Sequence, residues 1–338
     1  MESFNSALPP CRIFPNAISC KPFAQFISDT ILDRLSSGAI SLWGKVNDVP
    51  PLYLVMPLTI EPSTPCLCND NRFLNLWIRD VPFKLDSLAG LPRYLFPSSF
   101  QSVCDDKSGY DHVLLSPESR PYLGFEWGGR YFTSNTIPFG WKASAYIYHS
   151  IGLVASHYFH SLHIPCSLYI DDCHTGEINL SPLAPGYASL LSSQRKSLAR
   201  ANLAIFLVCF TLINLGYFLG ITKSILIPRQ IVHFLGFLVD SVCQSFLLIE
   251  EKKQKFLSLF HHVLHSDATD VKTLQRLLGK CISFSLAILG TCLFLNEVYN
   301  AIGKGLRYGS SKLIPISRPV REELQQWLFL ESWSGCLP

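Results

Sequence analysis

Apolar residues recur along the chain at two different spacings, and each spacing predicts a type of element. Phe23, Ile27 and Ile31 recur every three or four positions, which indicates a short helical N-terminal segment over about residues 10–45. The five prolines between residues 50 and 65 favour edge strands and turns over 52–67. A second helical stripe covers 144–163 and ends before Pro165.

Between the helical segments, short apolar runs bounded by turn residues predict strands. Gly128-Gly129 joins two such runs and is typical of a two-residue hairpin. Asp105 ends one strand, and Asp171-Asp172 form the tip of a second hairpin. The predicted strands are residues 100–104, 122–127, 131–133, 167–170, 173–178, 224–227 and 231–240.

Helices return after Glu250, for example along Leu274, Leu277 and Leu278 behind an expected cap at Asp270. This part of the chain is also basic. Residues 251–320 contain ten Lys and Arg against four Asp and Glu, which makes +6, whereas the whole chain carries only +3. A surface for nucleic acid is therefore expected in the C-terminal helices and not over the whole protein.

The composition excludes several protein classes. With 338 residues, the chain is long enough for about two domains. A hydrophobic share of 48% and a charged share of 16% exclude intrinsic disorder, collagen and coiled coil. None of the 12 cysteines forms a C-x-x-C pair and no secretory signal opens the chain, so we expect reduced thiols in the cytoplasm or nucleus.

One stretch raises the question of a membrane. Residues 201–221 contain no charged side chain and are about as long as a bilayer span, ~20 residues. Asn202, Thr211 and Asn214 interrupt the stretch, and Gly216 and Gly220 close it. We therefore expect a buried helix that packs against a sheet and ends near Gly220, with a membrane span as the alternative.

Three carboxylates are the main candidates for chemistry. If the strand that ends at Asp105 and the hairpin with Asp171 and Asp172 are neighbours in one sheet, the three side chains converge. Mg²⁺ prefers oxygen ligands of this kind and leaves positions for substrate phosphates. Two such ions can support an in-line phosphoryl displacement. A D-D dipeptide alone is more often a surface turn, so its surroundings decide the interpretation.

The residues around these carboxylates match one family in order and spacing. The matching motifs are PLTIEP and CLCNDNRFLNLW within 57–77, DDKSGYDHV at 105–113, IPFGWKASAYIY at 137–148, YIDD at 169–172, ITKSIL at 221–226 and FLGFLVDS at 234–241. From about residue 10 to 335 the chain resembles the reverse transcriptase domain of retroelements, and among them the tyrosine-recombinase retrotransposons of the DIRS group.

The resemblance implies an α+β fold with the shape of a right-hand polymerase. Fingers and palm would occupy residues 1–245, with an antiparallel sheet in the palm. A helical thumb and a truncated connection would occupy 246–338. The implied activity is RNA-directed DNA synthesis, with a template-primer duplex of RNA or DNA and deoxynucleoside triphosphates as partners and no membrane.

The resemblance also assigns roles to residues. Asp105, Asp171 and Asp172 would hold two Mg²⁺ ions, with Mn²⁺ as an alternative, whereas strand alternation turns Asp106 away as a structural residue. Lys223 would assist the leaving pyrophosphate. The residues expected to contact nucleotide, template or primer are Arg72, Tyr110, Phe139, Gly140, Lys142, Phe234, Leu235 and Gly236. Tyr110 would be the steric gate against a 2′-hydroxyl, and residues 234–237 would form the primer grip, a hairpin that seats the primer 3′ end.

Each of these assignments has a plainer alternative. Tyr110 also suits an apolar core, and residues 137–140 suit an ordinary turn. Lys223 also suits a solvated surface position, and Phe234 a buried strand. The matching motifs on either side favour the functional interpretation.

Two departures from the family pattern bear on activity. Where related elements carry Lys-Pro-Arg to hold the incoming triphosphate, this chain has Thr64, Pro65 and Cys66. Loss of one such donor costs on the order of 10²- to 10³-fold in rate. We therefore expect impaired polymerisation, and the alternative is a decayed copy that only binds nucleic acid. No ribonuclease H-like carboxylate cluster follows Glu251, so that domain and the recombinase would lie on separate or lost segments.

Overall fold

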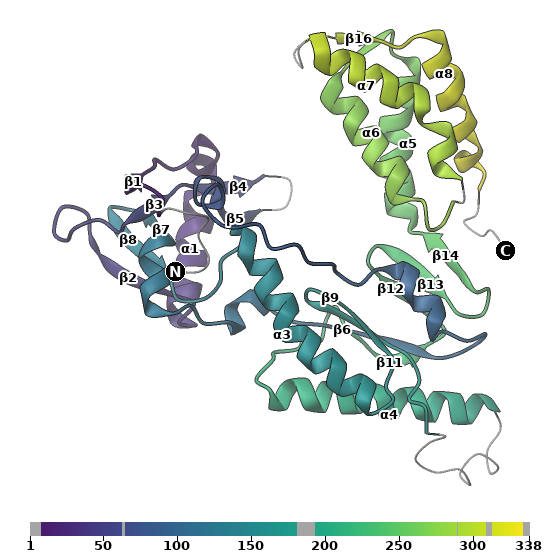
Figure 1. The fold of residues 1–338 in the computed structure, drawn as a ribbon, viewed down its shortest axis with the longest axis horizontal. Helices are drawn as coiled ribbons and strands as arrows, with labels where there is room; N and C mark the ends of the chain where they lie inside the picture. The colour runs from purple at the N-terminus through teal and green to yellow at the C-terminus, as the bar shows by residue number, and fades with distance from the viewer. Residues whose placement is uncertain (1–7, 63–64, 181–192, 289, 309–312, 334–338) are drawn as a thin grey trace.

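The computed structural model describes residues 8–62, 65–180, 193–288, 290–308 and 313–333. Figure 1 shows a sheet-rich N-terminal region and a group of C-terminal helices on opposite sides of a central sheet. The fold is therefore of the α+β class, as expected from the sequence.

The N-terminal region is built on a five-stranded sheet with the order β1-β3-β7-β8-β2. Helix α1 packs beside it and buries Ile27 and Ile31 with Phe125 and Phe132. The element bounds are β1 Arg12–Ile13, α1 Ala24–Ser36, β2 Ile40–Lys45, β3 Leu54–Met56, β7 Gly124–Trp127 and β8 Arg130–Ser134. A separate hairpin pairs β4 Leu58–Glu61 with β5 Cys66–Asn69.

The helical N-terminal segment is shorter than the sequence indicated. Gly38 has a φ of 77°, and the chain leaves the helix there. Residues Ile40–Lys45 then form β2, which pairs antiparallel with β8 and is not helical. Exposure along β2 does not alternate, because Leu42 and Trp43 are consecutive and both exposed, so no strand pattern marked this segment.

The central sheet is antiparallel and has the order β11-β6-β10-β9. Helices α3 and α4 lie along one side of it (Figure 1). Between helices and sheet, an apolar layer includes Phe159, Val208 and the thiols of Cys104, Cys166 and Cys173. The bounds are β6 Gln101–Asp105, α3 Lys142–Ser161, β9 Cys166–Tyr169, β10 Asp172–Thr175, α4 Ser193–Asn214 and β11 Ile225–Arg229.

Helix α4 differs from the expected buried helix in two respects. It ends at Asn214 and not near Gly220. Its inner face is buried, but its outer face is exposed. Within the described residues it is also the one helix long and apolar enough to cross a membrane, and 28% of its most apolar 18-residue window is buried.

A three-stranded antiparallel sheet connects the central sheet to the C-terminal helices. It consists of β12 Ile231–Phe234, β13 Phe237–Asp240 and β14 Ser245–Leu248. The predicted single strand over 231–240 is therefore a hairpin. Leu235 and Gly236 have φ values of 45° and 79°, the conformation of a two-residue hairpin turn.

The C-terminal helices form one core with this sheet. Phe256, Phe260, Leu274 and Trp327 are buried in the same cluster as Phe234. The expected cap of α6 is present, because Asp270 Oδ1 accepts a hydrogen bond from the Thr273 amide at 2.9 Å. The helices are α5 Glu250–His265, α6 Val271–Ser283, α7 Asn296–Tyr308 and α8 Arg318–Gln325.

Candidate polymerase active site

The central sheet brings the three predicted carboxylates together. Asp105, the last residue of β6, is the direct cross-strand partner of Asp172, the first residue of β10. Asp171 lies in the two-residue turn before β10, and its carbonyl accepts a hydrogen bond from the Asp106 amide at 3.0 Å. Ile170 precedes it with a φ of 55°, which is rare for a β-branched residue.

The neighbouring carboxylates act electrostatically on Asp171 and Asp172. Burial, followed by the charges of Asp171 and Asp105, raises the pKa of Asp172 to about 6. Burial and the charge of Asp105 also raise the pKa of Asp171. The Lys223 ammonium opposes both shifts. The site therefore concentrates negative charge that an added cation would offset.

Contacts from the segment after α4 hold Asp105 in place. Lys223 Nζ lies 3.5 Å from Asp105 Oδ1. The Asp105 amide donates to Ser224 Oγ at 3.0 Å, and its carbonyl accepts from the Gly220 amide at 2.7 Å. A Cβ atom at Gly220 would overlap with Asp105 Oδ2, so the backbone approaches this carboxylate closely.

These carboxylates are not a ready-made metal cage. Across the described parts of the chain, no group of three or more His, Cys, Asp or Glu side chains has an arrangement that could hold a metal ion by itself. The donors at the sheet end are nevertheless hard oxygens. Mg²⁺ commonly uses one or two protein carboxylates together with substrate phosphates, so this donor set suits a substrate-completed site.

Asp106 belongs to the interior, as strand alternation predicted. Its side chain is buried and accepts a hydrogen bond from the Tyr148 hydroxyl of α3 at 2.6 Å. Burial raises the pKa of Asp106 to about 7, whereas the Tyr148 hydrogen bond lowers it.

An aromatic surface lies next to the carboxylates. Tyr110, in the short helix η3 Gly109–His112, contacts Phe139 and Tyr148 with ring centroids 4.7 and 5.5 Å apart. Burial and then the charge of Asp171 raise the pKa of Tyr110. Phe139 is half exposed. Tyr110, the predicted steric gate, is therefore half-buried in an aromatic cluster, and the charge of Asp171 acts on its hydroxyl.

Asn75 is a positioning residue that sequence reasoning missed. Its side chain donates to the Gly140 carbonyl and accepts from the Lys142 amide, both at 2.8 Å, and so fixes the start of α3. Gly140 has a φ of 89°, and a Cβ there would overlap with the Asn69 carbonyl. The glycine is therefore required by a neighbouring strand, whereas the sequence suggested a ligand. No local pattern links Asn75 to a turn 65 residues later.

The two predicted cations at this edge are already paired. Lys142 Nζ lies 2.8 Å from Asp80 Oδ1 and donates to the Ile78 carbonyl at 2.7 Å. Arg72 forms an exposed ion pair with Asp70 at 2.5 Å. Each would have to exchange its partner to contact a phosphate. The cation whose charge acts on Asp171 and Asp172 is Lys223.

The predicted primer grip is a hairpin that packs on a buried chain of hydrogen-bonded side chains. This chain consists of Tyr94, His174 and Gln101, and we call it the relay. Phe234 is buried, and its ring lies 5.1 Å from the ring of His174 on β10. His174 Nε2 contacts Gln101 Oε1 at 2.7 Å, and the Gln101 amide donates to the carbonyls of Gln230 and Val239 at 2.9 Å each.

The hydrogen bonds of the relay also fix the tautomer of the His174 imidazole. Because Gln101 Oε1 accepts, His174 Nε2 carries the hydrogen, and His174 Nδ1 accepts from the Tyr94 hydroxyl at 3.0 Å. Burial lowers the pKa of His174 to about 3. Neither Tyr94, Gln101 nor His174 lies in a motif that would have marked it in the sequence.

The structure describes part of the segment in which the sequence departs from the family's Lys-Pro-Arg pattern. Cys66 begins β5 and is exposed, and its sulfur lies 4.0 Å from that of Cys68 on the same face. Thr64 lies outside the described residues. Cys66 therefore presents an uncharged side chain where an arginine was expected.

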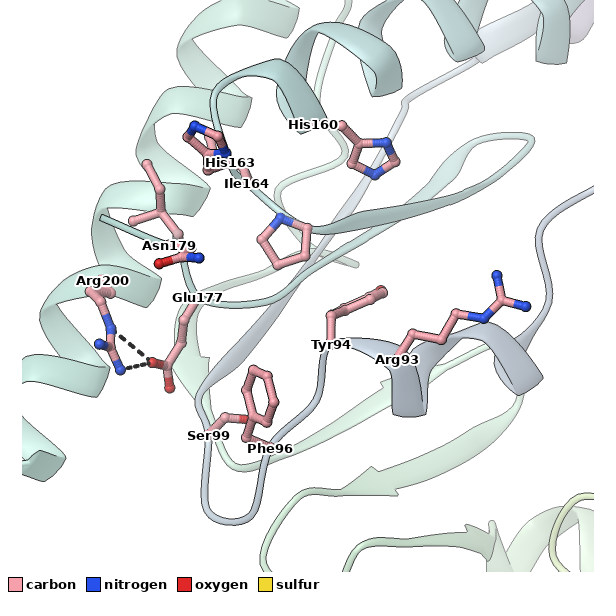
Figure 2. A pocket seen from close by; sticks show the side chains of 12 residues that line it. Arg93, Tyr94, Phe96, Ser99, His160, His163, Ile164, Glu177, Asn179 and Arg200 are labelled. Carbon is pink, nitrogen blue, oxygen red and sulfur yellow. Dashed lines mark hydrogen bonds and ion pairs between the residues drawn. The ribbon is translucent and has the colours of Figure 1, made fainter. Parts of the chain in front are cut away.

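A cavity of about 550 Å³ lies elsewhere. Figure 2 shows Tyr94, Phe96 and Ser99 on one side of it, and Glu177 paired with Arg200 on the other. The Arg200–Glu177 ion pair measures 2.7 Å. These residues precede β6 or follow β10, so the cavity is at the opposite end of the sheet from Asp105 and Asp172.

Solved structures share the fold over nearly the whole chain. The foamy viral protease-reverse transcriptase in complex with RNA/DNA hybrid matches with a TM-score of 0.71 and 18% identity, over 99% of this chain and 40% of that chain. The same viral protein, in a form called dRH and in complex with double-stranded DNA, matches with a TM-score of 0.70 and 18% identity, over 97% of this chain and 50% of that chain. The chain therefore spans about half the length of those structures.

The comparisons establish fold and not family membership. No model of a known protein family matches the chain, and no curated protein does. At 18% identity, the structural matches show that the chain has the fold of a reverse transcriptase polymerase.

Proposed function

We propose that the chain is a nucleotidyltransferase that extends a primer by RNA-directed DNA synthesis. The observation that carries this proposal is the register of the central sheet, which pairs Asp105 with Asp172 and places Asp171 in the adjoining turn. Two features support it. The fold is that of polymerases solved in complex with RNA/DNA hybrid and with double-stranded DNA, and the motifs around the carboxylates are in the order of retroelement enzymes.

In this proposal, Asp105, Asp171 and Asp172 hold two Mg²⁺ ions, or Mn²⁺, together with the triphosphate. The metal supplies Lewis-acid stabilisation of the phosphoryl oxygens and activation of the attacking hydroxyl. Lys223, 3.5 Å from Asp105, stabilises or protonates the leaving pyrophosphate.

The remaining predicted residues orient the reactants. Tyr110, braced by Phe139 and Tyr148, closes the space below the sugar of a deoxynucleotide. The hairpin at 234–236 seats the primer 3′ end, and its strands are supported by the relay, through the Phe234 ring on His174 and the Gln230 and Val239 carbonyls on Gln101. A near-attack geometry of this kind needs a rigid support.

The motifs also support a finer assignment. We propose an origin in a DIRS-group retrotransposon, with deoxynucleoside triphosphates as substrates and a template-primer duplex as partner. The ribonuclease H and recombinase of such an element would act from other segments. Because Cys66 is uncharged and exposed, we propose a reduced rate for this copy.

Primer extension on an RNA template with Mg²⁺ tests the proposal. Asp171→Asn should lower the extension rate by at least about 10²-fold, since it removes a charged ligand, while duplex binding stays unchanged. Asp48→Asn, an exposed carboxylate in the N-terminal region, is the matched control and should extend at the wild-type rate. Equal extension by wild type and Asp171→Asn would exclude the proposed site.

A further inference from the structure

The cavity of Figure 2, which we call the Tyr94 cavity, has the size and lining of a small-molecule site. Its volume of about 550 Å³ falls within the range of such sites, ~300–1,000 Å³. One side is formed by the end of helix η2 Leu88–Arg93 and the chain that follows it. The apolar part of the lining consists of Tyr94, Phe96, Ile164 and Pro165. Two aromatic rings in one wall suit a flat organic ligand.

The acidic group of the lining is already neutralised. Glu177 is the one acid among the described side chains that line the Tyr94 cavity. Its Oε2 lies 2.7 Å from Arg200 Nη2. Its Oε1 accepts hydrogen bonds from the Phe100 amide, at 3.0 Å, and from the Ser197 hydroxyl. Glu177 and Arg200 therefore form a wall without net charge, and neither is available to a ligand.

Other polar groups of the lining have no partner within the described residues. Arg93 is exposed, and its guanidinium forms neither an ion pair nor a hydrogen bond there. Ser99 is only 6% exposed, and its hydroxyl is buried without a hydrogen-bond partner. A buried hydroxyl is costly to leave unpaired, so a partner from outside the chain is expected. The charge that remains unpaired in the lining is positive.

We propose that the Tyr94 cavity binds an elongated organic anion, in which a flat ring system is joined to one phosphate or carboxylate. The ring system packs on Tyr94 and Phe96. Arg93 holds the anionic group, because a guanidinium can donate two parallel hydrogen bonds to a phosphate or a carboxylate. Ser99 forms a hydrogen bond with the far end of the ligand.

The shape of the cavity favours such a ligand over a simple ion. Figure 2 shows Arg93 and Ser99 well apart along the cavity, so a bare phosphate on Arg93 would leave the buried hydroxyl unpaired. An uncharged ring compound would leave Arg93 without a partner. Binding here would be independent of the proposed polymerase reaction, because the Tyr94 cavity lies at the opposite end of the central sheet from Asp105 and Asp172.

Isothermal titration calorimetry of the full chain without divalent metal tests the class of ligand. The two probes are deoxyadenosine monophosphate, a phosphate joined to a purine nucleoside, and indole-3-acetate, a carboxylate joined to an indole. At least one should bind tenfold or more tightly than its uncharged analogue, deoxyadenosine or indole-3-acetamide, and than phosphate or acetate alone. The probe that binds identifies the anionic group. If neither probe exceeds its analogues, the proposal is wrong.

Three variants locate the binding. Arg93→Gln should weaken it at least tenfold, whereas Arg130→Gln, which removes an exposed arginine from β8, should bind as wild type does. Asp171→Asn should also bind as wild type does, which separates the Tyr94 cavity from the proposed polymerase site. Wild-type affinity of Arg93→Gln, or lost affinity of Asp171→Asn, would overturn the proposal.

Ser99→Ala distinguishes a role in binding from a role in the fold. Because the hydroxyl has no partner within the described residues, the variant should unfold at the same urea concentration as wild type or at a higher one. Ligand affinity should nevertheless fall about threefold or more. A lower urea midpoint together with unchanged affinity would show that the hydroxyl supports the fold, and would contradict its proposed contact with the ligand.

Discussion

Gly220 is the residue on which the position of Asp105 depends most directly. Any Cβ at this position would overlap with the Asp105 carboxylate, whose backbone is already fixed by Gly220 and Ser224. To avoid the overlap, the carboxylate would have to turn away from its observed position at the end of the ladder with Asp172.

Gly220→Ala should therefore disable catalysis while leaving the fold intact. We expect the primer-extension rate to fall by about 10²-fold or more. The free energy of unfolding should fall by only about 1–3 kcal/mol, the usual cost of local overpacking. Stopped-time extension and urea denaturation measure the two effects separately.

Gly279→Ala in α6 is the control for that variant, because a Cβ there meets nothing within 4 Å. It should be slightly more stable than wild type, by up to about 1 kcal/mol, with unchanged extension. Full activity of Gly220→Ala would show that the Asp105 carboxylate does not need its observed position.

Cys66 allows a test for a gain of function. Cys66→Arg should accelerate nucleotide incorporation about tenfold or more, because it restores a cation near the expected triphosphate. Steady-state kinetics should show the change. Cys11→Arg, which also converts an exposed cysteine, should have no effect. An unchanged rate for Cys66→Arg would refute the proposed impairment at this position.

At the residue scale, the sequence predicted that the carboxylates converge, but not the contacts around them. Asp105 and Asp172 were recognisable because each lies at a strand end, where side chains meet. The ion pair of Lys142 with Asp80 joins residues 62 positions apart, and no local pattern encodes it. Gly140 was predicted to let the backbone approach a ligand, whereas the fold shows that it lets the backbone approach the Asn69 carbonyl.

At the scale of elements, the relay through His174 connects three pieces of secondary structure. It joins β10 to β6 through Gln101, and β6 to the β12–β13 hairpin through the Gln230 and Val239 carbonyls. Since the pKa of His174 is lowered to about 3 from 6.5, the native state keeps the imidazole neutral. The unfolded chain takes up a proton below about pH 6.5, so this group makes folding less favourable as pH falls from there towards 3.

His174→Gln should remove this acid sensitivity. Between pH 7 and 5, wild type should lose about 2 kcal/mol more free energy of unfolding than the variant, at about 1.4 kcal/mol per pH unit below 6.5. At pH 7 the variant should be the less stable protein, because the relay is broken. Urea denaturation at both pH values measures this. Parallel pH profiles would show that the imidazole is not buried in the neutral form.

Local elements were predictable where residues typical of turns bounded them in the sequence. Gly128-Gly129 forms the expected hairpin, and the helix expected over 144–163 is α3. The parallel pairing of β1 with β3 and of β3 with β7 was not predictable, because it depends on segments far apart in the chain. The apolar pattern predicted one strand over 231–240, because Leu235 is an unusual residue for a turn with positive φ, whereas the family resemblance implied the hairpin.

At the scale of the whole molecule, the basic C-terminal helices are expected to hold the duplex beside the hairpin. Lys252 of α5 lies against the ring of Phe237, 5.5 Å from its centroid, next to Gly236. Burial and the charge of Lys280 lower the pKa of Lys252. Two like charges kept close together favour a phosphate between them.

Lys252→Gln/Lys280→Gln should weaken duplex binding on every sequence alike. If both lysines neutralise phosphates, the slope of log affinity against log salt should become about 1.8 units shallower. Fluorescence anisotropy at several salt concentrations measures the slope. Lys21→Gln/Lys45→Gln removes the same charge from the N-terminal region and should leave the slope closer to wild type. An identical slope for the two double variants would contradict a specific role of the C-terminal helices.

The sequence placed the excess positive charge correctly but misjudged α4. Its charge-free stretch predicted a buried helix that packs against a sheet, and the sheet covers only one face of it. Hydropathy along a helix does not report how many of its faces have neighbours. The number of faces that are covered is determined by the tertiary fold.

The pairing of Asp105 with Asp172 has one more consequence, because the adjacent rung of the same ladder pairs Cys104 with Cys173. The acids and the thiols point to opposite sides of the sheet. A slip by a single residue would exchange them and drive ionised acids into the sulfur-lined interior, at a cost of several kcal/mol for each. The acids that are proposed to bind metal thus also disfavour a misaligned pairing of the two strands. Replacing them with neutral residues would make such a misalignment less costly, in addition to removing the proposed metal ligands.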